Sequence, residues 1–371
     1  MRVYIANADN SFKGSVVLGM GFTFDDTDTK GVASPLLEMQ RLIAINPSNA
    51  KCIFPYIGGE EINTSPTQAH HRFVINFGEM SENEARRWPD LLKIVEDKVK
   101  PDRMDDKRGV RKKYWWRFGE TAPALYRSIA TLKRVLARSQ VSSHHAFVFL
   151  ENKYVYDQRL VIFPLDTFAA FAALQATVHE IWSRFMGSTL KDDLVYAPSD
   201  CFEVFPFPID FEIDQRFEAA GKAYYEFRAR LMIQNYEGLT KTYNRFNDPA
   251  ETSPDIKSLR ELHAAMDRAI LDAYGWTDLQ TRCEFLLDYE EEGAEDDSST
   301  SRRKKPWRYR WPDEFRDEVL ARLLELNKQR AEEERLAGIE AEAATAKSGK
   351  NAPTKKKRSK DAAETPRLTG I

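Results

Sequence analysis

The sequence is poor in cysteine and lacks any long apolar run. Its 371 residues include 3 cysteines, Cys52, Cys201 and Cys283, with no Cys-x-x-Cys pair among them. This spacing argues against a cysteine-based zinc site and a disulfide framework, and it indicates free thiols in a reducing compartment. No stretch reaches the roughly 18 apolar residues of a membrane span, and the N-terminus turns polar before it reaches signal-peptide length. We therefore expect a cytoplasmic protein with no membrane partner.

An excess of charge of one sign is also missing. The chain carries 55 basic and 58 acidic side chains, for a formal net charge of -3. Any affinity for a polyanion must therefore come from local clusters of charge rather than from the total. The hydrophobic content of 42% is enough for two ordinary cores, so two domains are expected.

Two kinds of pattern divide the chain. Residues 1–208 mix short strand patterns with helices without a βαβ rhythm, which favours an α+β domain with a mixed sheet. Residues 209–289 have helical periodicity and no convincing strand, which predicts a second, mainly helical domain. Acidic, serine-rich residues 290–305 predict a linker, residues 306–346 a helix anchored by tryptophans, and lysine-rich residues 347–371 a disordered tail.

Local patterns predict particular elements in the first domain. A helix is expected over residues 35–45, and a capping box from Ser81 to Glu84 predicts a helix that continues to about Lys100. Strands are expected at 71–77, 134–139, 146–150 and 160–164, followed by one apolar helix at 168–187 and an extended stretch at 190–208.

One glycine motif has the form of a nucleotide-binding loop. Gly19 and Gly21 form a Gly-x-Gly in the segment LGMGF, but such a loop must connect a strand to a helix N-terminus that faces the ligand. The residues after Gly21 continue as strand and turn, so a bulged hairpin explains the motif better than cofactor binding does.

Nuclease chemistry is a weaker alternative. Asp90, Asp105 and Lys107 have the residue types that hold a divalent metal and a water molecule. A helix is expected between Asp90 and Asp105, whereas such a site needs neighbouring strands. The surrounding segment also contains so many charged residues that this combination of residue types can occur by chance.

Nucleophilic and methyltransferase motifs are missing. Ser142, His144 and His145 have no strand-turn-helix elbow and no assignable acid. Adjacent histidines on a strand point to opposite faces, which disfavours a shared metal. No Asn-Pro-Pro-Tyr or Asp-Pro-Pro-Tyr occurs, so we expect no catalytic residue, metal or cofactor in this chain alone.

Residues 101–116 form a basic and aromatic segment, which is the first feature of the sequence that indicates DNA binding. Basic side chains can neutralise successive phosphates with release of counterions, and aromatic rings stack on sugars or bases. An ordinary solvated face with a few core aromatics is the competing interpretation. The expected phosphate contacts are Arg103, Lys107, Arg108, Arg111, Lys112 and Lys113, and the expected stacking or sugar contacts are Tyr114, Trp115 and Trp116.

The second signal is a lysine and aspartate pair. Lys191 and Asp193 lie two residues apart, so in an extended segment they share a face. Lysine can donate to guanine O6 and N7, and aspartate can accept from cytosine N4, so the pair could read a G·C base pair. A surface turn with a local ion pair explains the same residues equally well.

Several further segments are distinctive: FPYIGGEEIN (54–63), RFVINF (72–77), VKPDR (99–103), Trp115-Trp116, YAPSDCFEVFPFP (196–208), GLTKTYNRF (238–246) and YGW (274–276). Together they resemble the target-recognition domain and helical C-terminal region of MmeI-like restriction-modification DNA methyltransferases. Such enzymes join an N6-adenine methyltransferase, often a nuclease, and a recognition domain in one chain. The resemblance covers residues 1–330, and the upstream methyltransferase half is missing from this sequence.

The resemblance implies a role for the residues just before the YAPSD segment. In the family this position touches base edges, which points to Lys191, Asp193 and Val195 here. The resemblance also implies double-stranded DNA as a partner, together with a separate N6-adenine methyltransferase chain that binds S-adenosylmethionine. A protein-interaction module of a phage-defence complex, with its C-terminal helix docking the partner, remains an alternative.

Overall fold

The structure is a computed structural model that describes residues 7–8, 10–190, 193–279, 282–288 and 306–350. The strands are β1 (Phe12–Lys13), β2 (Thr23–Phe24), β3 (Ile53–Ile57), β4 (Arg72–Ile75), β5 (Arg134–Ser139), β6 (Val141–Ser142), β7 (Val148–Glu151), β8 (Val155–Tyr156), β9 (Leu160–Phe163), β10 (Ser188–Leu190), β11 (Asp193–Val195), β12 (Glu284–Leu287) and β13 (Trp307–Arg310). The α-helices are α1 (Leu36–Ile45), α2 (Gly59–Thr64), α3 (Glu82–Ala85), α4 (Pro89–Lys98), α5 (Lys100–Asp105), α6 (Gly109–Lys113), α7 (Pro123–Ser128), α8 (Phe168–Gln175), α9 (Thr177–Met186), α10 (Pro198–Cys201), α11 (Gln215–Asn235), α12 (Leu239–Phe246), α13 (Pro254–Ala273) and α14 (Asp313–Lys350). Short 3-10 turns are η1 (Met20–Phe22), η2 (Pro47–Cys52) and η3 (Phe211–Ile213).

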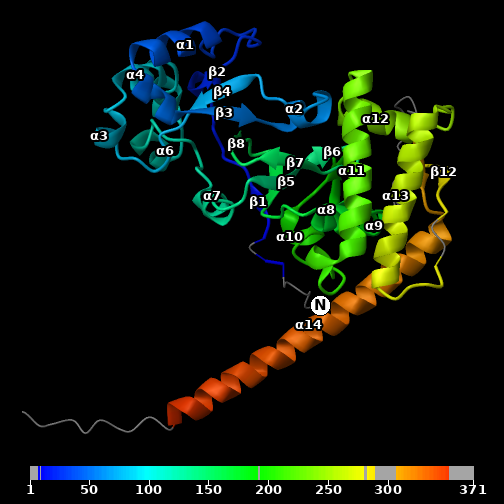
Figure 1. Ribbon diagram of the computed structural model, residues 1–371. Helices are drawn as coiled ribbons and strands as arrows, with labels where there is room; N and C mark the ends of the chain where they lie inside the picture. The colour runs from blue at the N-terminus through cyan, green and yellow to red at the C-terminus, as the bar shows by residue number, and fades with distance from the viewer. Residues whose placement is uncertain (1–6, 9, 191–192, 280–281, 289–305, 351–371) are drawn as a thin grey trace, which may run out of the picture.

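The first sheet and the helices that pack on it form a lobe, called the first lobe, with a core of its own. Its strand order is β2-β4-β3-β8, with β3 and β8 parallel and the other pairs antiparallel. Helices α1, α3, α4 and α6 gather at the outer end of this lobe (Figure 1). Strand residues Phe24 and Val74 pack in one cluster with Leu91 and Val95 of α4. Proline begins α4 because the first helical position needs no backbone donor.

A second sheet leads into the helical region. Its order is β1-β9-β5-β7, antiparallel throughout. Since β8 belongs to the first sheet and β9 to the second, the turn at residues 157–159 joins the two sheets. Helix α11 crosses α8 so closely that a Cβ at Gly221 would lie 2.2 Å from the carbonyl oxygen of Phe168.

The second sheet and the later helices share one core. Val135 and Ile162 of the sheet belong to the same buried cluster as Leu259 of α13 and Leu323 of α14. The predicted boundary at residue 208 therefore falls within a continuous core, whereas the first sheet packs around a separate one.

Helix α14 is anchored on the segment that ends at Pro208. Asn327 Nδ2 donates to Val204 O at 2.5 Å, and Arg330 Nη1 donates to Phe207 O at 2.5 Å. The hydroxyl of Tyr274, the residue that follows α13, donates to Pro206 O at 2.9 Å. Beyond this anchor α14 projects away from the body of the molecule (Figure 1).

The α+β class expected from the sequence is confirmed, with most strands before residue 208 and mainly helices after it. The capping box is confirmed as well, because Ser81 Oγ accepts from the backbone N–H of Glu84.

The extent of three predicted elements is wrong. The helix that begins after Ser81 ends at Ala85, and a new helix starts at Pro89. The apolar stretch 168–187 forms two helices, because the backbone of Ala176 between them is extended. The stretch after residue 190 contains a β-hairpin strand and the short helix α10 instead of one extended segment.

The region after residue 208 contains a β-ribbon that we did not predict. Strand β12 pairs with β13 in an antiparallel register, from Glu284 with Arg310 to Leu287 with Trp307. Helix α14 continues to Lys350, so residues 347–350 of the predicted disordered tail are helical. The predicted linker at 290–305 and the tail from 351 lie outside the described residues. Among the helices that the structure does describe, none is both long and apolar enough to cross a membrane.

Candidate nucleic-acid interface

Two of the predicted base-reading residues, Asp193 and Val195, lie on a strand of a β-hairpin. Strands β10 and β11 are antiparallel, and Leu190 pairs with Asp193. The chain therefore reverses between Leu190 and Asp193, whereas we expected one extended stretch over residues 190–208. Lys191 itself lies outside the described residues. Asp193 and Val195 are half-buried on one face of β11, while Leu194 between them is buried on the other.

The hairpin is supported by the short strand β6. Leu194 pairs with Ser142, and Val195 pairs with Val141. Beyond the strand, the backbone N–H of Tyr196 donates to Gln140 O at 2.8 Å. The Tyr196 hydroxyl is buried 3.0 Å from His179 Nε2. The root of β11 is thus fixed in the core, while its outer face stays accessible.

A second turn is connected to this hairpin through the backbone of Gln140, and sequence reasoning missed it. The backbone N–H of Gln140 donates to Arg159 O at 2.7 Å, so the turn between β8 and β9 continues the same row of backbone hydrogen bonds. Arg159 is exposed and forms no ion pair with another described residue, and Gln158 next to it is half-exposed. Arginine pairs with guanine and glutamine with adenine. Their place in a tight inter-strand turn was the available signal, but only the fold shows that Gln140 connects this turn to the end of β11.

Four of the predicted phosphate contacts are exposed. Lys107 and Arg108 precede α6, and Lys112 and Lys113 end it. Arg111 is half-buried and pairs with Asp106 at 3.0 Å, so part of its charge is already balanced. The sequence folds this segment as a short helix that displays its cations to solvent.

Arg103 is a correction to the predicted phosphate contacts. Its side chain is only 4% exposed. One guanidinium nitrogen donates to Val17 O at 3.2 Å and to Leu18 O at 3.1 Å. Burial lowers the pKa of Arg103 from its ordinary value. The residue ties α5 to the segment before η1 and has no surface to offer a phosphate.

The two tryptophans are corrections as well. Trp115 and Trp116 are each 5% exposed and belong to the core of the first lobe. The indole N–H of Trp116 donates to Met80 O at 2.9 Å. Their aromatic faces are therefore used in packing rather than in stacking on DNA. Tyr114 is half-exposed, with the Arg117 guanidinium 4.7 Å from its ring centre.

The structure does not bring all the predicted residues together. Helix α6 lies in the outer part of the first lobe, whereas β6, which supports the hairpin, lies near α11 in the middle of the molecule (Figure 1). Backbone hydrogen bonds through Gln140 connect the hairpin to the β8–β9 turn, whereas the basic helix α6 lies apart from both.

The glycine motif is structural. Leu18 and Gly19 have positive φ angles of 51° and 124°, and they lead into η1 and β2 rather than into an α-helix. A Cβ at Gly21 would lie 2.8 Å from Lys98 Cβ. The motif lets η1 approach α4 closely, which agrees with a packing role and not with a phosphate loop.

The nuclease alternative gains no support from the geometry. Asp90 lies in the first turn of α4, and Asp105 is the last residue of α5. Neither residue is on a strand. Within the described part of the chain, no group of three or more histidine, cysteine, aspartate or glutamate side chains could hold a metal ion.

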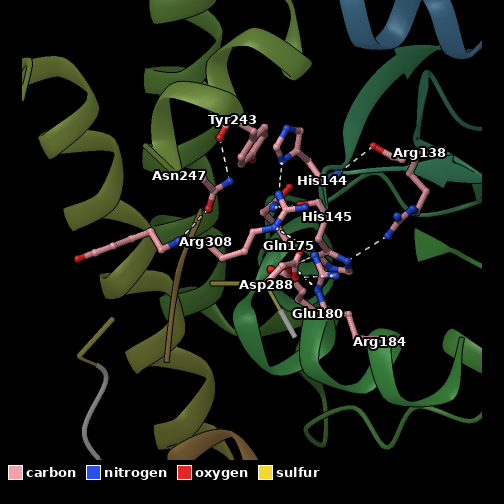
Figure 2. A network of polar contacts seen from close by, with 12 residues as sticks. Arg138, His144, His145, Gln175, Glu180, Arg184, Tyr243, Asn247, Asp288 and Arg308 are labelled. Carbon is pink, nitrogen blue, oxygen red and sulfur yellow. Dashed lines mark hydrogen bonds and ion pairs between the residues drawn. The ribbon is translucent and has the colours of Figure 1, made fainter. Parts of the chain in front are cut away.

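His144 and His145 form a junction between the sheets and the helical region (Figure 2). His144 Nε2 lies 2.8 Å from Asn244 Oδ1 on α12, and Nδ1 lies 3.2 Å from Arg308 Nη1 on β13. His145 Nδ1 lies 3.1 Å from Arg138 Nη1 on β5. The adjacent rings thus serve different partners, and neither is free to act on a substrate.

Two ion pairs lie next to these histidines, one of them formed by Arg308 of β13. Arg308 Nε donates to Asp288 Oδ2 at 2.9 Å, and Arg184 pairs with Glu180 at 2.9 Å. Burial, together with the nearby charge of Arg308, lowers the pKa of His144 to about 4. Burial alone would raise the pKa of Glu180, but Arg184 holds it below its ordinary value. The polar groups surround a cavity of about 40 Å³, which is room for a few water molecules.

The fold and the site define a class of protein: an α+β scaffold that presents a supported β-hairpin and a separate basic helix. The model of one family, described as the MmeI target recognition domain, matches residues 2–209. The chain belongs to this family.

A solved structure is similar over most of the chain. It is that of MmeI, a type IIL restriction-modification enzyme, in complex with DNA. The match has a TM-score of 0.58 and 18% sequence identity, and it covers 90% of this chain and 37% of the MmeI chain. At this identity the likeness is evidence of fold alone, and the chain spans well under half the length of MmeI. No curated protein matches.

Proposed function

We propose that the chain is the sequence-specific, double-stranded DNA recognition module of an adenine-specific N6 DNA methyltransferase in a restriction-modification or phage-defence system. The observation that carries this proposal is the family match over residues 2–209, which includes the supported hairpin. The chain acts with a methyltransferase chain in trans, and that partner binds S-adenosylmethionine and receives the flipped adenine.

The hairpin and the adjoining turn read base edges in this proposal. Asp193 accepts from cytosine N4, Val195 contacts a thymine methyl group, and Lys191 donates to guanine. Arg159 and Gln158 extend the readout by a further base pair, because backbone hydrogen bonds link their turn through Gln140 to Tyr196, the residue that follows β11. A short row of polar side chains on a rigid support is suited to the major groove, which admits a two-stranded ribbon.

The exposed cations on and beside α6 hold phosphates at a distance from the hairpin. Lys107, Arg108, Lys112 and Lys113 carry this role, Arg111 contributes less because of Asp106, and Tyr114 offers a sugar contact. A duplex carries phosphates along its whole length, so the two surfaces need not adjoin.

One observation supports assigning the chemistry to a partner: the sequence contains no Asn-Pro-Pro-Tyr motif. The purified chain should therefore transfer no radioactive methyl group from S-adenosylmethionine to DNA. Methylation by the chain alone would overturn the assignment of the chemistry to a partner.

A protein-interaction module is the second candidate, because α14 projects beyond the body. The two functions differ in their salt dependence. Phosphate-driven binding weakens steeply as salt rises, whereas apolar docking does not.

The proposal is tested by selection from a randomised duplex pool at two salt concentrations. We expect the wild type to retain a short asymmetric site and the double variant Lys191→Ala with Asp193→Ala to accept any base at one pair of it. The double variant Asp255→Ala with Lys257→Ala is the control, because it removes the same two charges from exposed positions on α13. No enrichment by the wild type at either salt concentration would refute sequence-specific recognition.

A further inference from the structure

The strand that supports the hairpin is itself short. Strand β6 has two residues and pairs with β11 through Leu194 and Val195. A strand of this length has little stability of its own. Its position must be set by what holds its ends, and the residues that follow it are Ser143, His144 and His145.

His144 fixes that end against the helical region. Its side chain contacts Asn244 on α12 and Arg308 on β13, and its ring stacks on Tyr243 with centroids 5.7 Å apart and planes at 27°. Its backbone N–H donates to Ser142 Oγ at 3.2 Å, which ties the backbone of His144 to the last residue of β6.

The hydrogen-bond partners assign the protonation of the ring. Arg308 can only donate, so Nδ1 of His144 must accept. Nε2 then carries the proton and donates to Asn244 Oδ1, and the ring is neutral. Both nitrogens are used by different elements, so a turn of the ring would lose both bonds at once.

We propose that His144 is a positioning residue for base readout, holding β6, and through it the strand that carries Asp193 and Val195, in register with α12 and β13. The inference rests on the proposed function. The helical region then contributes to specificity without touching the bases read by the hairpin. His144 needs no contact with DNA for this role.

The test compares three variants of the full chain. His144→Ala loses both side-chain bonds, and His144→Gln keeps an acceptor for Arg308 and a donor for Asn244. Thr177→Val is the matched control, because it removes a buried bond of 2.7 Å between α9 and Asp267 on α13 that does not involve β6. For each variant we would measure the melting temperature, the slope of affinity against salt, and the preference for the selected duplex over one with the hairpin-read base pair changed.

We expect His144→Ala to lower this preference by about tenfold, within the range that one base pair supplies, with an unchanged salt slope. His144→Gln should restore the preference, and Thr177→Val should lower only the melting temperature. If His144→Ala fails to fold, Asn244→Ala removes one of the two bonds at an exposed position and should give part of the loss. If the wild type prefers the selected duplex and His144→Ala or Asn244→Ala keeps that preference, this inference alone is overturned. If the wild type has no preference, the proposed function is overturned as well.

Discussion

The exposed cations around α6 give a quantitative prediction for DNA affinity. Of the six predicted phosphate contacts, Lys107, Arg108, Lys112 and Lys113 are exposed, while Arg103 is buried on two carbonyl oxygens. Each phosphate contact contributes about 0.9 to the slope of log affinity against log salt. Replacing all four exposed cations by glutamine should therefore reduce the magnitude of this slope by up to ~3.6. When the salt concentration rises fourfold, the affinity of the wild type should then fall by a factor roughly 150 times larger than that of the variant.

Fluorescence anisotropy with a labelled duplex at a series of salt concentrations measures this slope. Arg103→Met is the matched control, since it removes a cation of the same segment that is not on the surface. It should lower the melting temperature and leave the slope unchanged. The reasoning is refuted if the fourfold variant keeps the wild-type slope, or if Arg103→Met changes the slope as much as the exposed cations do.

Three further predictions concern the second turn, the glycine motif and the buried histidine. Arg159→Ala should reduce the discrimination in binding free energy at one base pair by about 1–3 kcal/mol, measured with duplexes that differ by a single base pair. Arg87→Ala is the control, because it removes an exposed arginine from the turn after α3, and it should leave this discrimination unchanged. Gly21→Ala should cost about 1–3 kcal/mol by overpacking against Lys98, while Gly109→Ala meets no atom within 4 Å and should be close to neutral in urea unfolding. The pKa of His144 in the folded state is about 4, below its ordinary 6.5, so the unfolded state binds a proton more readily. The contribution of His144 to the free energy of unfolding is therefore present in full above pH 6.5. It is lost as the pH falls toward 4, by up to about 1.4 kcal/mol per pH unit. His144→Gln should reduce this slope without removing it, because burial also lowers the pKa values of His145 and His179, and an equal slope in the variant would contradict the assignment.

The sequence predicted elements where local signals were strong. The capping box at Ser81 and the strand at 134–139 are confirmed, because capping and alternation act between near neighbours. The single helix expected at 168–187 was wrong, since both of its halves are apolar and the break at Ala176 leaves no mark in the pattern. The ribbon of β12 and β13 was missed because its pairing joins segments about 20 residues apart.

The site was harder to predict than the fold, because burial cannot be read from residue type. Arg103 and the two tryptophans have the composition of a DNA surface, yet their side chains complete the first core. Arg159 lies in a tight turn between two strands, but only the hydrogen bond from Gln140 connects that turn to the hairpin.

The central claim, that the face of β11 reads bases, is tested most directly by photocrosslinking. A photoreactive phenylalanine analogue would replace Val195 in one variant and Lys113 in another, each bound to the selected duplex. We predict that the probe at 195 crosslinks to a base inside the selected site and that the probe at 113 crosslinks to the sugar-phosphate backbone outside it. A probe at 195 that gives no crosslink to any base, while the probe at 113 still reacts, would contradict the account.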